Sequence, residues 1–333
     1  MIDNLLSRLL SAPDSPSADL YFRNACGDFL DTQVQQIAPT VFLSSEACLV
    51  VRHAMRSGPL PMRKRLIYLL DDDVEAGVED MSLPFLYRQK LRMVEQPAGR
   101  NLLPRADIAV VSSPFLEQAL SPHVRTHRLM PYWSEGFAPV DHFDRALLPG
   151  GRFDIAYLGS FAHRNDLKFL WPVFANLLAR FDQVHVHLPQ RHALPHGFEL
   201  HPRVHRINGA GWTEYRAGLS DRRFHVALYP LLDTPFNQAR SPNKLIEHAV
   251  VGAAPLYSAT WCEAERIEHG VSGLCLPNAP HAWIDAIAAL IHRPDRARQL
   301  AEGAQTVASR LNDREPQRAL WRELLGIRER SVA

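Results

Sequence analysis

The feature that most constrains the fold is an alternation of short apolar runs with helical patterns, which fills most of the chain. In the first half, the apolar runs are Thr40–Ser44, Arg65–Leu70 and Ala106–Ser112. Helical composition follows the first run over Ser45–Arg56 and the third over Ser113–Leu120. Strands that alternate with helices in this way predict a parallel sheet with helices on its faces.

A second round of the alternation follows Pro139–Arg152, a segment with two prolines, two adjacent glycines and no clear period. The apolar run Phe153–Leu158 restarts the pattern, and Leu167–Phe181 has apolar residues at helical spacing. We interpret the break as an interdomain linker. Later strands are expected at Val184–Leu188, Val204–Ile207, Phe224–Leu228, Ala254–Tyr257 and Gly273–Leu276, and later helices at Thr213–Leu219, Asn243–Val251, Ala282–Ile291 and Asp295–Leu311.

The length of 333 residues is too great for one ordinary core. We therefore predict an α/β protein of two doubly wound, Rossmann-like domains that face each other across a cleft. The expected units are residues 1–148, residues 149–316 and a charged terminal helix over residues 317–333. Folds of this kind bind ligands at the carboxyl ends of their strands.

Composition and charge exclude several classes of protein. The net charge is +1, from 37 basic and 36 acidic residues, so the chain as a whole has no charge that would attract nucleic acid. Its four cysteines include no C-x-x-C pair, which argues against a zinc or thioredoxin site. Sparse cysteines fit a reducing compartment, and we predict a cytoplasmic protein with no nucleic-acid partner.

The first residues do not resemble a signal peptide. They include Asp3, no early basic cluster and only a short apolar stretch, and no run of eighteen apolar residues occurs in the chain. Met1–Leu10 has the pattern of a short amphipathic helix, which we expect to pack on the protein. A peripheral contact with the inner face of the membrane stays open as an alternative.

The most informative segment is Phe224–Ser258, where a strand, a polar loop and a helix follow one another. We predict Ser241 as the N-cap of this helix, with Pro242 in its first turn, because helix starts favour these residues. Lys244 and Glu247 lie three positions apart and therefore share one face of the helix near its start.

The beginning of this helix has the chemistry of a diphosphate site. Unpaired N–H groups and a partial positive charge are expected at Ser241 and Asn243, and Lys244 and Arg240 add cations. Glu247 can accept two hydrogen bonds from a ribose diol, because a carboxylate is a bidentate acceptor. The alternative is an intrahelical ion pair between Lys244 and Glu247, worth about 0.2–0.5 kcal/mol.

Two further loops are candidates for contact with the same ligand. Gly159 and Ser160 follow a predicted strand, and such small residues allow a phosphate to approach the backbone. The guanidinium of Arg164 suits a diphosphate. Asn208 and Gly209 close another strand, where backbone groups could face a nucleobase. For Gly159 and Ser160, a plain strand-to-helix turn is the alternative.

The second half of the chain resembles the C-terminal domain of the group-1 glycosyltransferases, which have the GT-B fold and act on nucleotide sugars. The resemblance is carried by Ser241–Ser258 (SPNKLIEHAVVGAAPLYS), by the glycine turn Gly270–Leu274, and by Asp154–Gly159 with His163 and Arg164. It covers about residues 153–311. It is fairly specific for the fold and for the class of donor, and weak for the particular sugar.

The resemblance implies that Glu247 binds the ribose and that Lys244 or Arg240 binds the diphosphate. It implies transfer of a hexose-type sugar to a hydroxyl of a glycan, lipid-linked or protein acceptor, in bacterial polysaccharide or glycoconjugate synthesis. No metal and no cofactor beyond the donor substrate is expected, and retention of configuration follows by analogy. The last helix is expected to cross back to the first domain. Many retaining members have a further glutamate eight positions before the ribose-binding one, where this chain has Ala239.

Three adjacent acids, Asp71, Asp72 and Asp73, directly follow the predicted strand Arg65–Leu70. Adjacent carboxylates repel one another unless something uses them. In GT-B enzymes the matching loop faces the cleft, so Asp72 or Asp73 is predicted to act as a base or to orient the acceptor hydroxyl. An N-cap cluster for the next segment and a divalent-metal site of the D-x-D type are the alternatives.

Three other functions stay open at this point. A non-catalytic nucleotide-sugar-binding or assembly subunit of the same fold is kept open by Ala239. A nucleotide-sugar epimerase would need acid–base pairs around one sugar, and no clear set is seen. A GT-A glycosyltransferase would use Asp71–Asp73 with manganese, but such enzymes lack the pattern over Ser241–Ser258.

Overall fold

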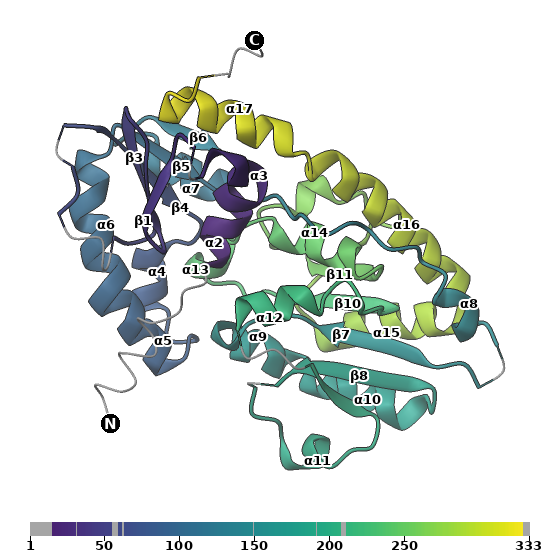
Figure 1. Ribbon diagram of the computed structural model, residues 1–333. Helices are drawn as coiled ribbons and strands as arrows, with labels where there is room; N and C mark the ends of the chain where they lie inside the picture. Colours follow the sequence, from purple (N-terminus) through teal and green to yellow (C-terminus); the bar gives the residue numbers. More distant parts are fainter. Residues whose placement is uncertain are drawn as a thin grey trace, which may run out of the picture.

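The computed structural model describes residues 15–30, 32–54, 59–61, 63–148, 150–190, 192–207 and 211–328. Two six-stranded sheets organise it (Figure 1). We call the sheet β1–β6 with its helices the N-terminal unit, and the sheet β7–β12 with its helices the C-terminal unit. Both units combine parallel strands with covering helices, so the predicted α/β fold of two Rossmann-like units is confirmed.

The N-terminal sheet has its strands in the order of the chain. They are β1 Gln35–Ala38, β2 Val41–Leu43, β3 Ala47–Val51, β4 Arg65–Leu70, β5 Ile108–Val111 and β6 Thr126–Arg128. Strands β3 to β6 pair in parallel, whereas β1 and β2 form an antiparallel edge beside β3. Because β4 and β5 are parallel neighbours, the acids 71–73 and the serines 112–113 lie at the same edge of the sheet.

The helices of the N-terminal unit are mostly short. In chain order they are α2 Pro16–Ala18, η1 Asp19–Arg23, α3 Asn24–Cys26, η2 Gly27–Phe29, α4 Val74–Glu79, α5 Phe85–Lys90, η3 Leu91–Glu95, α6 Gln96–Leu102, η4 Leu103–Arg105 and α7 Pro114–Leu120. The first four follow one another without a break, so residues 16–29 form one helical segment at the start of the described chain.

The C-terminal sheet is parallel throughout and has the order β12-β11-β10-β7-β8-β9. Its strands are β7 Phe153–Tyr157, β8 Val184–Pro189, β9 Val204–Ile207, β10 Val226–Tyr229, β11 Ala254–Ser258 and β12 Leu274–Leu276. The order reverses between β7 and β10. In doubly wound sheets such a reversal opens a crevice at the carboxyl ends of the two strands, and ligands bind there.

The helices of the C-terminal unit are α8 Phe143–Ala146, η5 Phe161–His163, α9 Arg164–Phe169, α10 Trp171–Arg180, α11 His196–Glu199, α12 Trp212–Ala217, α13 Pro235–Gln238, α14 Asn243–Val250, η6 Ala264–Arg266, α15 Pro280–His292 and α16 Pro294–Leu311. The apolar stripe predicted for α10 is confirmed, since Val173, Phe174 and Leu177 are buried there. Helices α10 and α15 share a core with one face of the sheet, and α14 covers the other face.

Among the described residues, no helix is both long and apolar enough to cross a bilayer.

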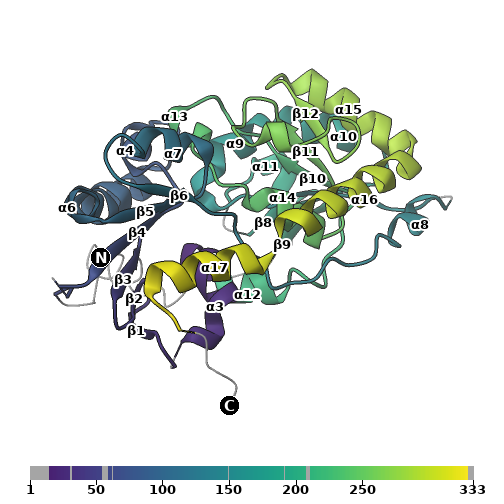
Figure 2. The same ribbon diagram turned by 90° about the horizontal axis from the view of Figure 1, so that it is seen from above.

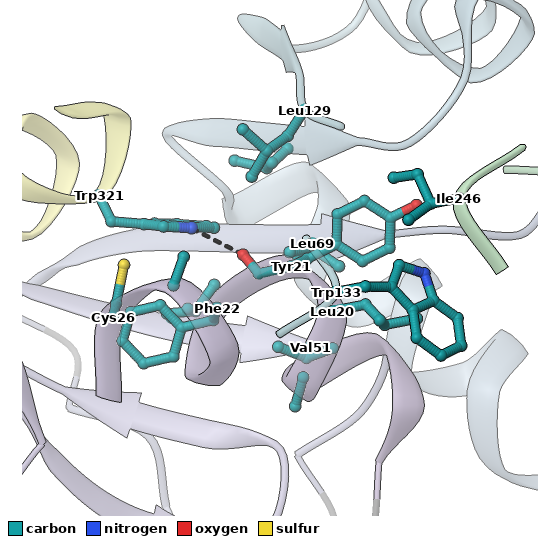
Figure 3. Packing of buried hydrophobic residues seen from close by; sticks show 14 of the residues in the cluster. Leu20, Tyr21, Phe22, Cys26, Val51, Leu69, Leu129, Trp133, Ile246 and Trp321 are labelled. Carbon is teal, nitrogen blue, oxygen red and sulfur yellow. Dashed lines mark hydrogen bonds between the residues drawn. The ribbon is translucent and has the colours of Figure 1, made fainter. Parts of the chain in front are cut away.

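One hydrophobic core continues from the N-terminal unit into the C-terminal unit. It joins Tyr21 and Phe22 of η1 to Ile246 of α14 and to Trp321, near the end of the chain. Figure 3 shows the Tyr21 ring turned toward Ile246 and the Trp321 indole above Phe22. Trp321 Nε1 donates a hydrogen bond to the backbone oxygen of Tyr21, 2.7 Å away.

The last helix, α17 Arg314–Leu325, lies on the N-terminal unit beside α3 (Figures 1 and 2). Asp313 caps its beginning. Gln317 Nε2 donates to the backbone oxygens of Leu20 and Met130, at 2.8 and 2.7 Å. The chain therefore returns to its first unit after completing the second.

The predicted helix over Ser45–Arg56 is wrong, because Ala47–Val51 forms strand β3. All five residues of β3 are buried, and the strand pairs with β2 on one side and β4 on the other. A short apolar run inside a sheet has no distinguishing period, so its sequence also fits a buried helix. Arg52 follows in the left-handed region, with φ of 62°, and turns the chain out of the sheet.

Candidate functional site

The candidate site lies where α14 begins, beside the end of β7. Lys244 Nζ donates to the backbone oxygen of Leu158, 2.7 Å away, and forms an ion pair with Glu247. The predicted shared face of Lys244 and Glu247 is thereby confirmed, and the intrahelical ion pair that was the alternative to ligand binding is also present. Because Leu158 directly precedes Gly159 and Ser160, Lys244 links two of the segments that the sequence singled out. Both lie at the reversal of strand order, where doubly wound sheets bind ligands.

The prediction that Ser241 is the N-cap of this helix is wrong by one residue. Helix α14 begins at Asn243, and Pro242 is its N-cap, with φ of −75° and ψ of 12° and no capping side chain. The hydroxyl of Ser241 instead accepts a hydrogen bond from Asn243 Nδ2, 2.8 Å away. The N–H groups of the first turn therefore have no side-chain cap, which favours an anionic ligand at this helix end.

The carboxylate of Glu247 is buried and held from two sides. It is 2% exposed, with Oε2 facing Lys244. On the other side, Tyr215 Oη donates to Oε1 over 2.5 Å. Burial first, and then the charge of Glu247, raise the pKa of Tyr215 well above its ordinary value, so the hydroxyl stays a donor. Tyr215 belongs to α12 and was not singled out from the sequence, because nothing local in the chain points to a contact with Glu247.

The loop after β7 contributes backbone groups at the same edge of the sheet. Gly159 is required there, because an added Cβ would lie 2.2 Å from Tyr157 Oη. Ser160 is exposed before η5, and Arg164 is exposed at the start of α9. The other predicted loop residues, Asn208 and Gly209, lie outside the described residues.

A buried charge network connects the two units. Arg240 forms an ion pair with one oxygen of Asp72, and Arg52 Nη1 contacts the other oxygen at 2.6 Å. The same Arg52 guanidinium reaches Asp71 at 2.8 Å and Glu95 at 2.6 Å. Burial raises the pKa of Asp72, but Arg240 and Arg52 outweigh it and hold this pKa below its ordinary value. Arg240 is thus directed to the N-terminal unit, and Asp72 is its charged partner.

The three adjacent acids are each engaged with protein groups. Asp73 is the N-cap of α4, where its Oδ1 accepts from the N–H of Ala76 at 2.9 Å. Asp71 accepts a hydrogen bond from Ser17 Oγ at 2.6 Å. Within the described residues, no group of three or more His, Cys, Asp or Glu side chains is arranged to hold a metal ion. A catalytic role for Asp72 or Asp73 stays a prediction.

Ala239 occupies the position where the resemblance predicts a further glutamate. It is fully buried and packs with Val111 and Leu116 of the N-terminal unit. Phe236, three residues earlier, packs against Val74 and other apolar residues of the same unit. A carboxylate at position 239 would lose its hydration in this apolar contact. The contact between the units therefore uses a small side chain in place of an acid.

Comparison with protein-family models found no match, and comparison with curated proteins found none either. Solved structures do match. Sucrose-phosphate synthase from Thermosynechococcus elongatus is 16% identical, with a TM-score of 0.56 over 80% of this chain and 69% of that one. HepE from Anabaena in complex with UDP-glucose is 16% identical, with a TM-score of 0.57 over 79% of this chain and 72% of that one.

TarM from S. aureus is a third structure of the same fold. It is 10% identical, with a TM-score of 0.56 over 79% of this chain and 50% of the TarM chain. At such low identity the likeness concerns the fold alone. The chain therefore has the two-domain GT-B fold that its sequence pattern predicts.

Proposed function

We propose that this protein is a glycosyltransferase that moves a hexose-type sugar from a nucleoside-diphosphate sugar to a hydroxyl acceptor. The observation that carries the proposal is the meeting of Lys244, Glu247 and the uncapped start of α14 at the end of β7. The fold supports it, because structures of this fold include HepE in complex with UDP-glucose.

In this proposal each group of the site has one task. Glu247 accepts hydrogen bonds from the ribose, while Lys244 and the N–H groups at Asn243 hold the diphosphate. Arg164, Ser160 and the backbone at Gly159 approach the same phosphates from the loop after β7. The leaving diphosphate gains negative charge in the transition state, and donors that are already in place stabilise this charge. We propose that no metal or other cofactor is needed and, by analogy with the group-1 family, that configuration is retained.

The N-terminal unit is proposed to bind the acceptor, a hydroxyl of a glycan, lipid-linked or protein molecule in bacterial polysaccharide or glycoconjugate synthesis. Four large apolar side chains are exposed within residues 81–93 of this unit, namely Met81, Phe85, Leu86 and Met93. The segment meets the C-terminal unit at Ser82, whose backbone oxygen accepts from Asn165 Nδ2 at 2.6 Å. This surface supports a lipid-linked acceptor and a peripheral contact with the inner face of the membrane.

A second candidate function is a non-catalytic subunit of the same fold that only binds a nucleotide sugar. The buried, apolar contact of Ala239 favours it, because no carboxylate reaches the sugar from that position. The two candidates share the nucleotide site and differ in turnover. Release of sugar from the donor, with or without an acceptor, therefore separates them.

Calorimetric titration with UDP, GDP and ADP, followed by turnover assays with the matching sugar nucleotides in EDTA, tests the proposal. At least one nucleotide is expected to bind, and Glu247→Gln should raise its dissociation constant about tenfold or more, because hydrogen bonds to a charged group are lost. Asp154→Asn is the matched control. It removes a carboxylate that pairs with Arg152 and His187 at the opposite end of β7.

Three outcomes would count against parts of this proposal. If no nucleotide binds the wild-type protein, the nucleotide site is rejected. If Glu247→Gln binds as tightly as the wild type, the assignment of Glu247 is rejected. Binding without any release of sugar across a panel of acceptors would favour the non-catalytic subunit, and loss of turnover in EDTA would contradict independence from metal.

A further inference from the structure

Helix α12 links the buried carboxylate of the site to the N-terminal unit. Tyr215 donates to Glu247 on one side of this helix. Its neighbour Trp212 donates from Nε1 to Asp19 Oδ2 of η1, 2.6 Å away. Arg216 contacts the same unit, with 3.0 Å from Nη1 to Asn24 Oδ1. The short helix α12 is thus held to the N-terminal unit by Trp212 and by Arg216, near its two ends.

Glu247 is buried, but its two hydrogen-bonding partners do not use all of its acceptor positions. Each carboxylate oxygen offers about two acceptor positions. Lys244 uses one position on Oε2 and Tyr215 uses one on Oε1, so each oxygen keeps a position for a further donor. Rotation of a carboxylate about its last torsion is otherwise broad. Tyr215 and Lys244 together therefore select one plane for the carboxylate, and Tyr215 supplies the contact on Oε1.

We propose that Tyr215 is a positioning residue for the donor ribose. It holds Glu247 in the orientation in which both oxygens accept from the 2′- and 3′-hydroxyls, and α12 is held rigid for this purpose by its contacts with η1 and α3. This inference rests on the proposed function, since it assigns Glu247 to the ribose. Tyr215 itself need not touch the nucleotide. Its substitution should therefore weaken nucleotide binding only when the ribose diol is present.

The decisive experiment compares a nucleoside diphosphate with its 2′,3′-dideoxy counterpart in wild type and in Tyr215→Phe, by calorimetry. The pair is taken from UDP, GDP or ADP, whichever binds the wild type most tightly. Wild type should prefer the ribose form by about tenfold or more. Tyr215→Phe should reduce this preference by about three- to tenfold, while its affinity for the dideoxy form stays within about twofold of wild type.

Tyr257→Phe is the matched control. Its hydroxyl donates to the backbone oxygen of Lys244 at 3.3 Å, so it also supports α14 but does not reach Glu247. This variant should keep the wild-type preference for ribose. Thermal unfolding of each variant shows that the proteins compared are folded.

The outcomes separate the inference from the function on which it rests. If wild type binds none of the three nucleotides, or binds ribose and dideoxy forms equally, the proposed role of Glu247 fails. If wild type prefers ribose and Tyr215→Phe keeps the full preference, only the inference about Tyr215 is overturned. Equal weakening of both ligands in Tyr215→Phe would also overturn it, because that is the result of a merely structural role.

Discussion

At the scale of single residues, three adjacent and chemically identical acids do different work. Asp71 accepts from Ser17 and Arg52, and burial raises its pKa while Arg52 opposes the shift. Asp72 bridges two arginines, one from each unit. Asp73 caps a helix. These differences follow from the partners that the fold brings to each carboxylate, and they make the same substitution informative at two neighbouring positions.

We predict that Asp72→Asn and Asp73→Asn differ strongly in stability. Asp72→Asn leaves the largely buried Arg240 without its anionic partner and should lower the free energy of unfolding by about 3–5 kcal/mol. Asp73→Asn should cost less than about 0.5 kcal/mol, because asparagine caps helices as well as aspartate does. Chemical denaturation measures both values.

The same pair of variants also tests the predicted catalytic role. If Asp73 acts as a base, Asp73→Asn abolishes turnover in a protein of nearly wild-type stability. Equal and small losses of stability in the two variants would contradict the buried network between Asp72 and the arginines. A large loss in Asp73→Asn would instead show that its carboxylate does more than cap α4.

The sequence predicts a contact of the site only when the two contacting residues lie close together along the chain. The contact of Lys244 with Glu247 was predictable, because helical spacing fixes a pair three residues apart. The partner of Glu247 in α12 and the partner of Arg240 in the other unit lie 32 and 168 residues away. Such contacts exist only after distant elements have packed against one another, so no local pattern encodes them.

At the scale of elements, the contact between α4 and α13 joins the two units near the site. Gly77 of α4 makes the contact close. An added Cβ would lie 2.7 Å from Leu91 Cδ1 and 2.8 Å from Phe236 Cδ2, and both neighbours are fully buried. The short helix α13 can therefore sit against α4 only while position 77 has no side chain.

A pair of glycine substitutions measures this contact. Ala is favoured over Gly inside a helix by about 1 kcal/mol. Gly99→Ala in α6 should show this gain, because the nearest atom to its Cβ, Tyr68 Oη, lies 3.4 Å away. In Gly77→Ala, overpacking should remove the gain, and we expect this variant to be less stable than Gly99→Ala by about 1–3 kcal/mol in chemical denaturation. Equal stabilisation by both substitutions would show that α13 is not held against α4 in solution.

The elements themselves were predicted unevenly. The apolar stripe of α10 marked a helix because one face of it is buried and the other is not. The sequence of β3 also fits a helix, because the strand is buried along its whole length and its residues show no period. Strand β2 lies within the predicted run Thr40–Ser44, but the alternation of strands and helices does not predict β1 or its antiparallel pairing with β2. Periodicity in a sequence therefore predicts elements that are buried on one face. It does not identify elements that are buried on both faces.

At the scale of the whole molecule, the two units share one apolar core and the chain returns to close it. The core contains residues of η1 and α17 together with residues of α14 and of the C-terminal sheet. Separation of the units would expose this surface to water. We therefore expect the described parts of both units to unfold together in a single cooperative transition, although a chain of this length often unfolds in steps.

Trp321→Ala tests this coupling at the point where the chain returns. Trp321 is fully buried, lies edge-on to Phe22 at 5.5 Å and donates a hydrogen bond to η1. In wild type, guanidinium unfolding followed by circular dichroism and by tryptophan fluorescence should give coincident curves. Trp321→Ala should lower the free energy of unfolding by about 3–5 kcal/mol.

Trp171→Ala is the control. Trp171 is half-buried and packs within the C-terminal unit alone, so its loss of stability should be smaller and the two unfolding curves should still coincide. Two separate transitions in the wild type, or a loss below about 1 kcal/mol in Trp321→Ala, would mean that the units fold independently and that α17 only rests on the first of them.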